Sequence, residues 1–457
     1  MHSSANLTEG SITKGVIYFA LPLMLSNLFQ QLYNSIDSAV VGSFAGEVSL
    51  AAVGSTAALI NLLIGFFLGI ATGTGVLVAM RYGASDWAGL KKICDAAMFL
   101  AFAAALGIGA LGILFAPQLL RMIDMPENVL PEATVYLRIY LMGNIPNLLY
   151  NVAAGIIRAM GDSKRPLLYL GFSGVLNLIL DLLFVAVLKM GAAGAALATV
   201  LAQLLSCVLS VGYLMRLPED YCFRPLQMRL DRGAIRDVIH ISVPCGLQAA
   251  MFNISNLLVQ ARINAFGSTV MAGTTAYGKL DGFIYMPTGA LSLTVSTYVG
   301  QNIGAGHIER VKRGIRLCLG MAMLVGACMG ALVIAAFRPA IGLFTDEAAV
   351  MAVARQEMFF LAPFAWVFTV SDILGGAMRG AGEATPVMLI SAGCICVFRI
   401  LWLTLVLHFF PDIRVVFLCY PVSWVLSSAA MTAYYFLFSR LKKTIRSTNG
   451  VLLNEAQ

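Results

Sequence analysis

The sequence places two aspartates deep inside long apolar stretches, where a charged side chain is costly. Asp37 lies ten residues before Glu47, and Asp181 lies eight residues before Lys189. At about 1.5 Å per helical residue, both would lie roughly 12–15 Å from the outer end of the helix. Asn177, four residues before Asp181, shares its helix face. Two carboxyl groups close together in a low dielectric cannot easily both ionise, so the pair predicts a site that binds a proton or shares a cation. The alternative is that each aspartate is a structural polar group, hydrogen-bonded between helices.

The second half of the chain carries its own charges inside apolar stretches. Lys279, Asp281 and Arg399 are candidates for a second polar cavity. Asp372 is a further acid. Arg399 could pair with Asp372 or with Asp281, and Lys279 could pair with Asp281 or a neighbour. We leave open whether these residues form structural ion pairs or a second substrate or coupling site.

The composition requires a solvent other than water around most of the chain. Hydrophobic residues make up 59% and charged residues only 12%, whereas a soluble domain carries roughly 25% charged residues. We therefore expect a polytopic protein whose main partner is the lipid bilayer. The nine cysteines and four histidines form no pattern that would hold a metal, so we expect no cofactor and no metal beyond Na⁺ at Asp37 and Asp181.

Twelve apolar segments are long enough to span a bilayer as helices, because backbone groups in hydrocarbon must be hydrogen-bonded within their own segment. The fold class predicted is an all-α polytopic membrane protein with twelve transmembrane helices. The expected spans are 15–44, 50–80, 93–116, 133–156, 166–188, 192–216, 238–267, 271–301, 315–338, 354–378, 386–409 and 413–439.

Most of the 30 basic residues lie in the loops on one side of these spans. By the positive-inside rule that side is cytoplasmic. We therefore expect a protein of the inner membrane, with both termini and the loop 217–237 in the cytoplasm. The net charge of +7 is thereby explained as a topology signal, and we expect no nucleic-acid partner.

The second half of the chain repeats motifs of the first half in the same order and at an almost constant offset. Residues 158–162 (Arg-Ala-Met-Gly-Asp) return as 379–383 (Arg-Gly-Ala-Gly-Glu), and Pro22 returns as Pro244. Six spans per half is an even number, so the repeats are parallel and predict two pseudo-symmetric six-helix bundles. The predicted domains are an N-terminal six-helix bundle at 1–216, a cytoplasmic linker at 217–237, and a C-terminal six-helix bundle with a cytoplasmic tail at 238–457.

Several short motifs occur together in a characteristic order and spacing. They are Pro22 followed by Asp-Ser-Ala-Val-Val-Gly at 37–42, Gly83-Ala84, residues 158–162 with Pro166, Asn177 to Asp181, Gly-Ala-Ala-Gly-Ala-Ala-Leu-Ala-Thr at 191–199, Gln-Asn-Ile-Gly-Ala-Gly at 301–306, and Arg-Gly-Ala-Gly at 379–382. In these motifs the chain resembles the multidrug and toxic compound extrusion (MATE) family, and within it the prokaryotic DinF-like branch. The resemblance covers about residues 10–440.

The resemblance implies two bundles around a V-shaped cavity that opens alternately to each side. It implies export of amphipathic or cationic compounds, driven by entry of H⁺ or Na⁺. The cation-coupling residues that it implies are Asp37, Asn177, Asp181, Thr199 and Tyr136, with Tyr140 as a competing candidate for the last position. The family's bending first helix would use Pro22 as its hinge. Other members carry an acid in the seventh span for Na⁺ coupling, and this chain has none there.

Our prediction is a secondary-active multidrug efflux transporter, acting as a monomer on small amphipathic or cationic substrates. The alternative is a flippase for a lipid-linked sugar precursor, which Lys279 and Arg399 keep open because such a cavity should hold a pyrophosphate. A membrane-embedded enzyme needs a catalytic motif that the sequence does not contain, so we expect no catalytic residues. An ATP-driven pump is disfavoured, since there is no Walker A sequence.

Overall fold

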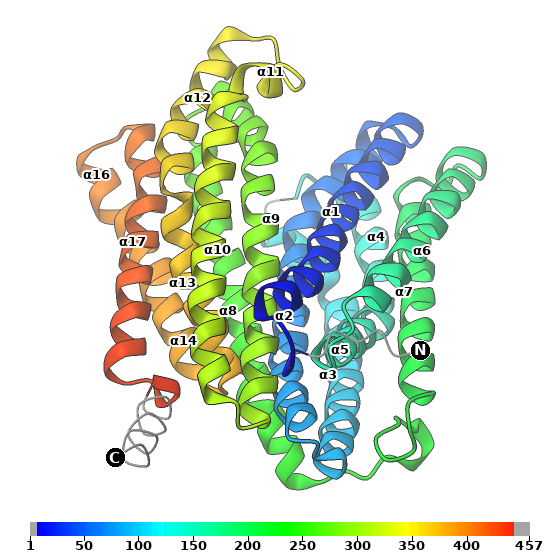
Figure 1. Ribbon diagram of the computed structural model, residues 1–457. Coiled ribbons are helices and arrows are strands. Elements are labelled where there is room, and N and C mark those ends of the chain that lie inside the picture. The colour runs from blue at the N-terminus through cyan, green and yellow to red at the C-terminus, as the bar shows by residue number, and fades with distance from the viewer. Residues whose placement is uncertain (1–6, 124, 443–457) are drawn as a thin grey trace. The chain divides into compact units, whose positions relative to one another are not determined.

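The computed structural model describes residues 7–123 and 125–442, apart from the side chains of residues 32–35, 38 and 47. Every regular element in these ranges is a helix (Figure 1). The chain divides into two compact units. The first unit contains Leu21–Gly246, and the second contains the described residues up to Ala20 and from Leu247 onward.

The first half of the chain forms long helices with one interruption and one π-helical turn. In chain order they are α1 (Ile12–Phe44), α2 (Gly46–Gly83), α3 (Trp87–Arg121), α4 (Leu130–Met142), α5 (Asn144–Ala159), α6 (Lys164–Asp181), the π-helical turn η1 (Leu182–Val187), α7 (Gly191–Met215) and the short 3-10 turn η2 (Pro225–Gln227).

The second half repeats this order but is more irregular near its end. Its elements are α8 (Arg232–Asn264), α9 (Ser268–Gly304), α10 (Ile308–Ala335), α11 (Phe337–Ile341), α12 (Ala348–Leu361), η3 (Ala362–Phe364), α13 (Ala365–Gly380), α14 (Ala384–Ser391), η4 (Ala392–Val397), α15 (Phe398–Leu401), η5 (Trp402–Val406), α16 (Leu407–Phe409) and α17 (Ile413–Leu437).

The helical segments coincide with the twelve predicted spans to within a few residues at each end. Ten of the described helical segments are long and apolar enough, by length and composition alone, to cross a membrane. The two others are α9, which is long but more polar, and the α4–α5 segment, which Gly143 divides into pieces of 13 and 16 residues. The fold is therefore the predicted all-α polytopic one.

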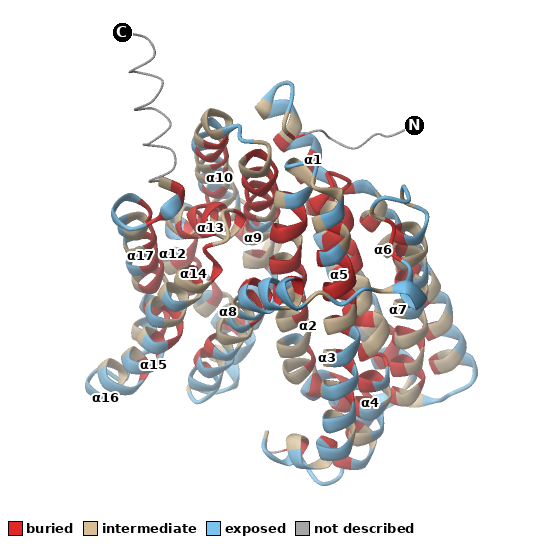
Figure 2. Cartoon of the chain, turned by 90° about the horizontal axis from the view of Figure 1, so that it is seen from below, coloured by how far each residue is buried: buried red, intermediate tan, exposed pale blue. Residues whose placement is uncertain are grey.

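Helix α5 forms the centre of the first unit, where it packs against α2, α3 and α7. It is buried along most of its length, as the red ribbon in Figure 2 shows. The close approach of α5 to α2 needs a glycine, because a Cβ atom on Gly155 would lie 2.7 Å from the carbonyl oxygen of Ala71. Small residues let helix backbones approach in this way.

Helix α13 takes the same central place in the second unit, against α9, α10 and α17. A Cβ atom on Gly376 would lie 2.6 Å from the carbonyl oxygen of Ser292. In the internal repeat, Gly376 is the counterpart of Gly155 and Ser292 is the counterpart of Ala71. Each unit therefore uses the same glycine contact to bring its central helix against its second long helix.

The first helix of each repeat is divided between the two units. In α1 the division falls between Ala20 and Leu21, directly before Pro22, and in α8 it falls between Gly246 and Leu247, shortly after Pro244. A proline inside a helix removes one backbone hydrogen bond and crowds the preceding turn. Each helix is thus locally weakened next to the point at which it passes from one unit to the other.

Residues 7–10, which precede α1, are held on the second unit by Arg310 of α10. Its guanidinium donates hydrogen bonds to the carbonyl oxygens of Leu7 (3.3 Å), Glu9 (3.1 Å) and Gly10 (3.0 Å). Asn302 adds a bond from its Nδ2 to the carbonyl oxygen of Leu7 at 3.1 Å. These contacts fix the residues that precede α1.

Candidate functional site

The two aspartates singled out by the sequence lie together in the first unit. Asp37 projects from α1 and is partly buried, while Asp181 ends α6 and is completely buried. The two carboxyl groups lie close enough to interact electrostatically. No described residue donates a hydrogen bond to Oδ1 of Asp37 or to either carboxyl oxygen of Asp181, and these oxygens are buried. Two ionised carboxyl groups facing each other in a low dielectric repel, so this arrangement favours a bound proton or a shared cation.

Two of the other predicted coupling residues lie on α6 and α7, which pack against each other. Asn177, one turn before Asp181 on α6, and Thr199 on α7 are both buried. No described residue bonds to Nδ2 of Asn177. The amide and hydroxyl oxygens of these two side chains would add to the carboxyl oxygens if the site held Na⁺, which binds oxygen ligands.

Tyr136 and Tyr140 are both buried on α4, with their rings stacked at a centroid distance of 6.4 Å. Tyr140 lies close enough to Asp37 to interact with it electrostatically. The structure thus brings Tyr140 toward the aspartates, and Tyr136 packs against its ring. Which tyrosine acts in coupling stays a prediction.

A second carboxyl group, that of Glu132, holds the start of α7, the helix that carries Thr199. Glu132 accepts hydrogen bonds from the hydroxyl of Ser49 and from the backbone N–H of Ala192 (3.2 Å). An anion at a helix N-terminus is favourable because the first N–H groups have no partner within the helix. Gly191 adopts φ +58°, and a Cβ there would lie 3.0 Å from Glu132. The motif glycine therefore makes room for the capping carboxylate.

A π-helical turn, η1, begins directly after Asp181. Such turns are rare and interrupt the regular ladder of backbone hydrogen bonds. Two further π-helical turns, η4 and η5, stand on either side of Arg399 in the second half. The three π-helical turns in the described ranges thus lie close to Asp181 or Arg399. Hydropathy alone did not indicate these turns.

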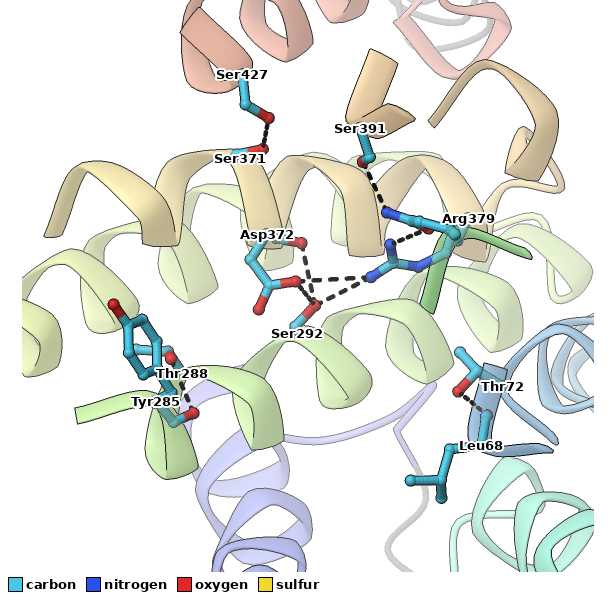
Figure 3. Close-up of polar contacts among 11 residues, drawn as sticks. Leu68, Thr72, Tyr285, Thr288, Ser292, Ser371, Asp372, Arg379, Ser391 and Ser427 are labelled. Carbon is cyan, nitrogen blue, oxygen red and sulfur yellow. Dashed lines mark hydrogen bonds and ion pairs between the residues drawn. The ribbon is translucent and has the colours of Figure 1, made fainter. Parts of the chain in front are cut away.

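The pairing of Asp372 in the second unit differs from the predicted alternatives. Its carboxylate lies 3.8 Å from the guanidinium of Arg379 and accepts a hydrogen bond from Ser292 at 2.8 Å (Figure 3). Arg379 also donates to Gln248 at 3.1 Å. Of the alternatives left open for Arg399, a pairing with Asp372 is not found among the described residues. Arg379 lies just beyond the predicted span 354–378. Helix α13 continues through this residue, so Arg379 and Asp372, seven residues apart, lie on the same face of one helix.

The other second-half candidates differ in exposure: Lys279 is exposed, Asp281 is half-buried and Arg399 is buried. The side chain of Lys279 is exposed on α9. Arg399 is 1% exposed and donates to Ser423 (3.0 Å) and Asn256 (2.9 Å). Asp281 accepts a hydrogen bond from Tyr277 at 3.2 Å. No ion pair joins Arg399 to Asp281 among the described residues.

Sequence reasoning missed one buried acid, Glu357 of α12. It lies three residues into the predicted span 354–378, close enough to the boundary to resemble a loop residue, but its side chain is only 6% exposed. The internal repeat could have indicated it, because the offset that relates Arg158 to Arg379 also relates Tyr136 to Glu357.

Comparison with known proteins identifies the family. The MatE family profile matches residues 22–183 and again 244–404, which confirms the internal repeat. "Probable multidrug resistance protein YpnP" of Bacillus subtilis (strain 168) is 29% identical over 386 residues, 84% of this chain and 86% of its own length. "Probable multidrug resistance protein YoeA" of the same organism is 25% identical over 447 residues, 96% of each chain. A solved structure described as "Crystal structure of MATE in complex with MaL6" has the same fold, with a TM-score of 0.89 at 20% identity, covering 97% of this chain and 100% of that one. With two matched stretches that take in most of its length, this chain belongs to the MatE family of membrane transporters.

Proposed function

We propose that this protein exports small amphipathic or cationic compounds across the cell membrane in exchange for H⁺ or Na⁺. Two relatives named as multidrug resistance proteins support the transport of drugs. We further propose that the protein lies in the inner membrane with both termini in the cytoplasm, and that it acts as a monomer.

The observation that carries the coupling proposal is that the carboxyl groups of Asp37 and Asp181 interact electrostatically, while both oxygens of Asp181 are buried without a hydrogen-bond donor among the described residues. With one proton, the pair carries a single negative charge. Without it, two like charges face each other. At about 4 Å and an effective dielectric of 20, such a repulsion is of the order of 4 kcal/mol. Ion occupancy therefore changes the preferred separation of α1 and α6.

Pro22 provides the point at which α1 can respond. It lies 15 residues before Asp37 on the same helix, or about 22 Å along the axis. A modest bend at the proline would move Asp37 away from Asp181 after deprotonation. A substrate shifts this equilibrium only if its affinity differs between the two states. Export then follows if substrate and ion favour opposite states of the first helix.

The test is transport in proteoliposomes under separately imposed H⁺ and Na⁺ gradients. We expect Asp37→Asn and Asp181→Asn to reduce gradient-driven export to the level of protein-free liposomes, because a neutral amide cannot exchange the ion. Asp346→Asn, which alters an exposed acid before α12, is the matched control and should export normally. Unchanged export by Asp37→Asn would remove the aspartate pair from coupling. The gradient that drives the wild-type protein identifies the ion.

A further inference from the structure

The second unit contains a buried polar cluster at the place that the repeat relates to the candidate coupling site. The offset that takes Pro22 to Pro244 also takes Asn177 to Arg399. The same offset takes the two aspartates to Val259 and Leu403, which are apolar and buried. In the second repeat, apolar residues thus stand where the first repeat has its two aspartates. Charged residues stand at the positions of two neighbours, with Arg399 in the place of Asn177 and Glu357 in the place of Tyr136.

The members of this cluster come from four helices of the second unit. Asp281 shares one face of α9 with Tyr277 and Tyr285, since each is four residues away. Glu357 projects from α12, which packs against both α9 and α17. Arg399 from α15 lies over the ring of Tyr420 of α17, at 4.5 Å.

The two acids are close enough to interact electrostatically, and both interact with Tyr285 and Tyr420. The Oε2 atom of Glu357 is buried, and no described residue bonds to it. The tyrosines donate only one bond to this pair, from Tyr277 to Asp281. An acid whose buried oxygen has no donor is costly in its ionised form.

The charges of the cluster do not balance. Tyr277 and Tyr285 from α9 and Tyr420 from α17 face the acids, and Arg399 from α15 reaches the cluster through the rings of Tyr285 and Tyr420. Arg399 is the single permanent positive charge among them, and its printed hydrogen bonds go to Ser423 and Asn256. Two ionised acids and one guanidinium leave one uncompensated negative charge in a low dielectric, which is expensive.

We propose that Asp281 and Glu357 together hold one exchangeable proton, so that the second unit contains a proton-binding site of its own. One proton makes the cluster neutral overall: one carboxylate, one carboxylic acid and one guanidinium. The nearby guanidinium disfavours Na⁺ at the same place, because the two cations would repel each other. This site is separate from Asp37 and Asp181, and its existence does not depend on export.

The test is infrared spectroscopy of the full chain in lipid bilayers, where a protonated carboxyl group has its own C=O stretching band. The background variant carries Asp37→Asn and Asp181→Asn, which removes the first-unit carboxyl groups and makes the result independent of the proposed coupling. In this background we expect a protonated-carboxyl component at neutral pH that is unaffected by Na⁺ and disappears on alkaline titration.

Single substitutions then distinguish a shared proton from two acids that are neutral through burial alone. Adding either Glu357→Gln or Asp281→Asn should remove the same component, because the remaining carboxylate is balanced by Arg399. Adding Arg399→Gln should increase the component, because both acids then take up a proton. Asp346→Asn should leave the spectrum unchanged, and Glu357→Asp, which keeps the acid, should retain the component if Glu357→Gln fails to fold.

Three results would overturn the proposal. If Glu357→Gln and Asp281→Asn both leave the protonated-carboxyl band of the background variant unchanged, both acids are ionised. Partial survival of the component, or its loss in only one of the two variants, would mean that a carboxyl group is neutral on its own. Loss of the component on addition of Na⁺ would make the ligand a metal cation rather than a proton.

Discussion

The charge of Arg379 is stabilised by several partners at once. Arg379 contacts Asp372, Gln248 and Ser292, and Gln248 in turn donates to Ser391 at 2.8 Å. These contacts join α8, α9, α13 and α14 within the second unit. A polar network of this kind is favourable only while all of its members are satisfied, because each lost partner leaves another group unpaired in a low dielectric.

Replacing Asp372 by Asn should therefore destabilise the second unit. The pair is 12% and 22% exposed at its two side chains, so we expect a loss of about 1–3 kcal/mol rather than the larger cost of a completely buried pair. The measurement is thermal unfolding in detergent of Asp372→Asn, Arg379→Gln and the double variant. Coupling predicts a double variant less destabilised than the sum of the two single variants, and simple additivity would contradict it.

The identity of the site acids could be predicted from the sequence, but their pairing could not. Asp37 and Asp181 are conspicuous because each is an isolated carboxyl group in a long apolar stretch, and their depths follow from residue counts. The partner of Asp372 depends on how α13 is rotated against α9, which no residue count specifies. Glu357 was overlooked because the boundary between a span and its loop is uncertain by about 2–4 residues.

Helix packing depends on a few glycines with identical roles in both units. Gly376 of α13 rests on the backbone of α9 at Ser292, as Gly155 rests on that of α2 at Ala71. Backbone cannot move aside as the end of a flexible side chain can. A larger residue at either position must therefore separate two helices.

Substituting Ala for Gly376 should lower the unfolding free energy by about 1–3 kcal/mol, the range for overpacking a tight contact. The matched control is Gly320→Ala in α10, where a Cβ atom would meet nothing within 4 Å. That change should be neutral or stabilising by up to about 1 kcal/mol, because Ala is the better helix former. Equal thermal unfolding of the two variants in detergent would show that the α9–α13 contact is not tight.

The helical segments were predictable because a bilayer imposes them, whereas their irregularities were not. A long apolar run must form a helix across hydrocarbon, so hydropathy located the spans to within a few residues. The division of α4 from α5 at Gly143 and the π-helical turns η1, η4 and η5 depend on tertiary contacts. Gly143 and Pro146 mark the first of these points in the sequence, whereas the π-helical turns lie within apolar runs that carry no such signal.

At the scale of the whole molecule, the N-terminal residues belong to the second unit although most of α1 belongs to the first. Arg310 provides the contacts that fix them, through three carbonyl oxygens before α1. These residues lie about 300 positions from Arg310 in the sequence, so only the folded structure could reveal the contact.

Arg310→Gln should increase hydrogen–deuterium exchange in residues 7–20, since the segment would lose the bonds that fix its start. Arg313→Gln on the same helix is the control, because Arg313 is exposed. We expect exchange elsewhere in α10 to be similar in both variants. Equal protection of residues 7–20 in the two variants would mean that the hydrogen bond from Asn302 and the apolar contacts of Leu7 hold the segment without Arg310.

The division of α1 and α8 between units has a practical consequence for cutting the gene in two. A break in the loop before α8 would yield one fragment ending without residues 232–246 of its own compact unit, and another beginning without residues 7–20 of its own. The N-terminal fragment would carry residues 7–20, which belong to the second unit, and the C-terminal fragment would carry residues 232–246, which belong to the first. Reassembly would then demand a reciprocal exchange, as in domain-swapped dimers, and neither piece would be expected to fold well when produced alone.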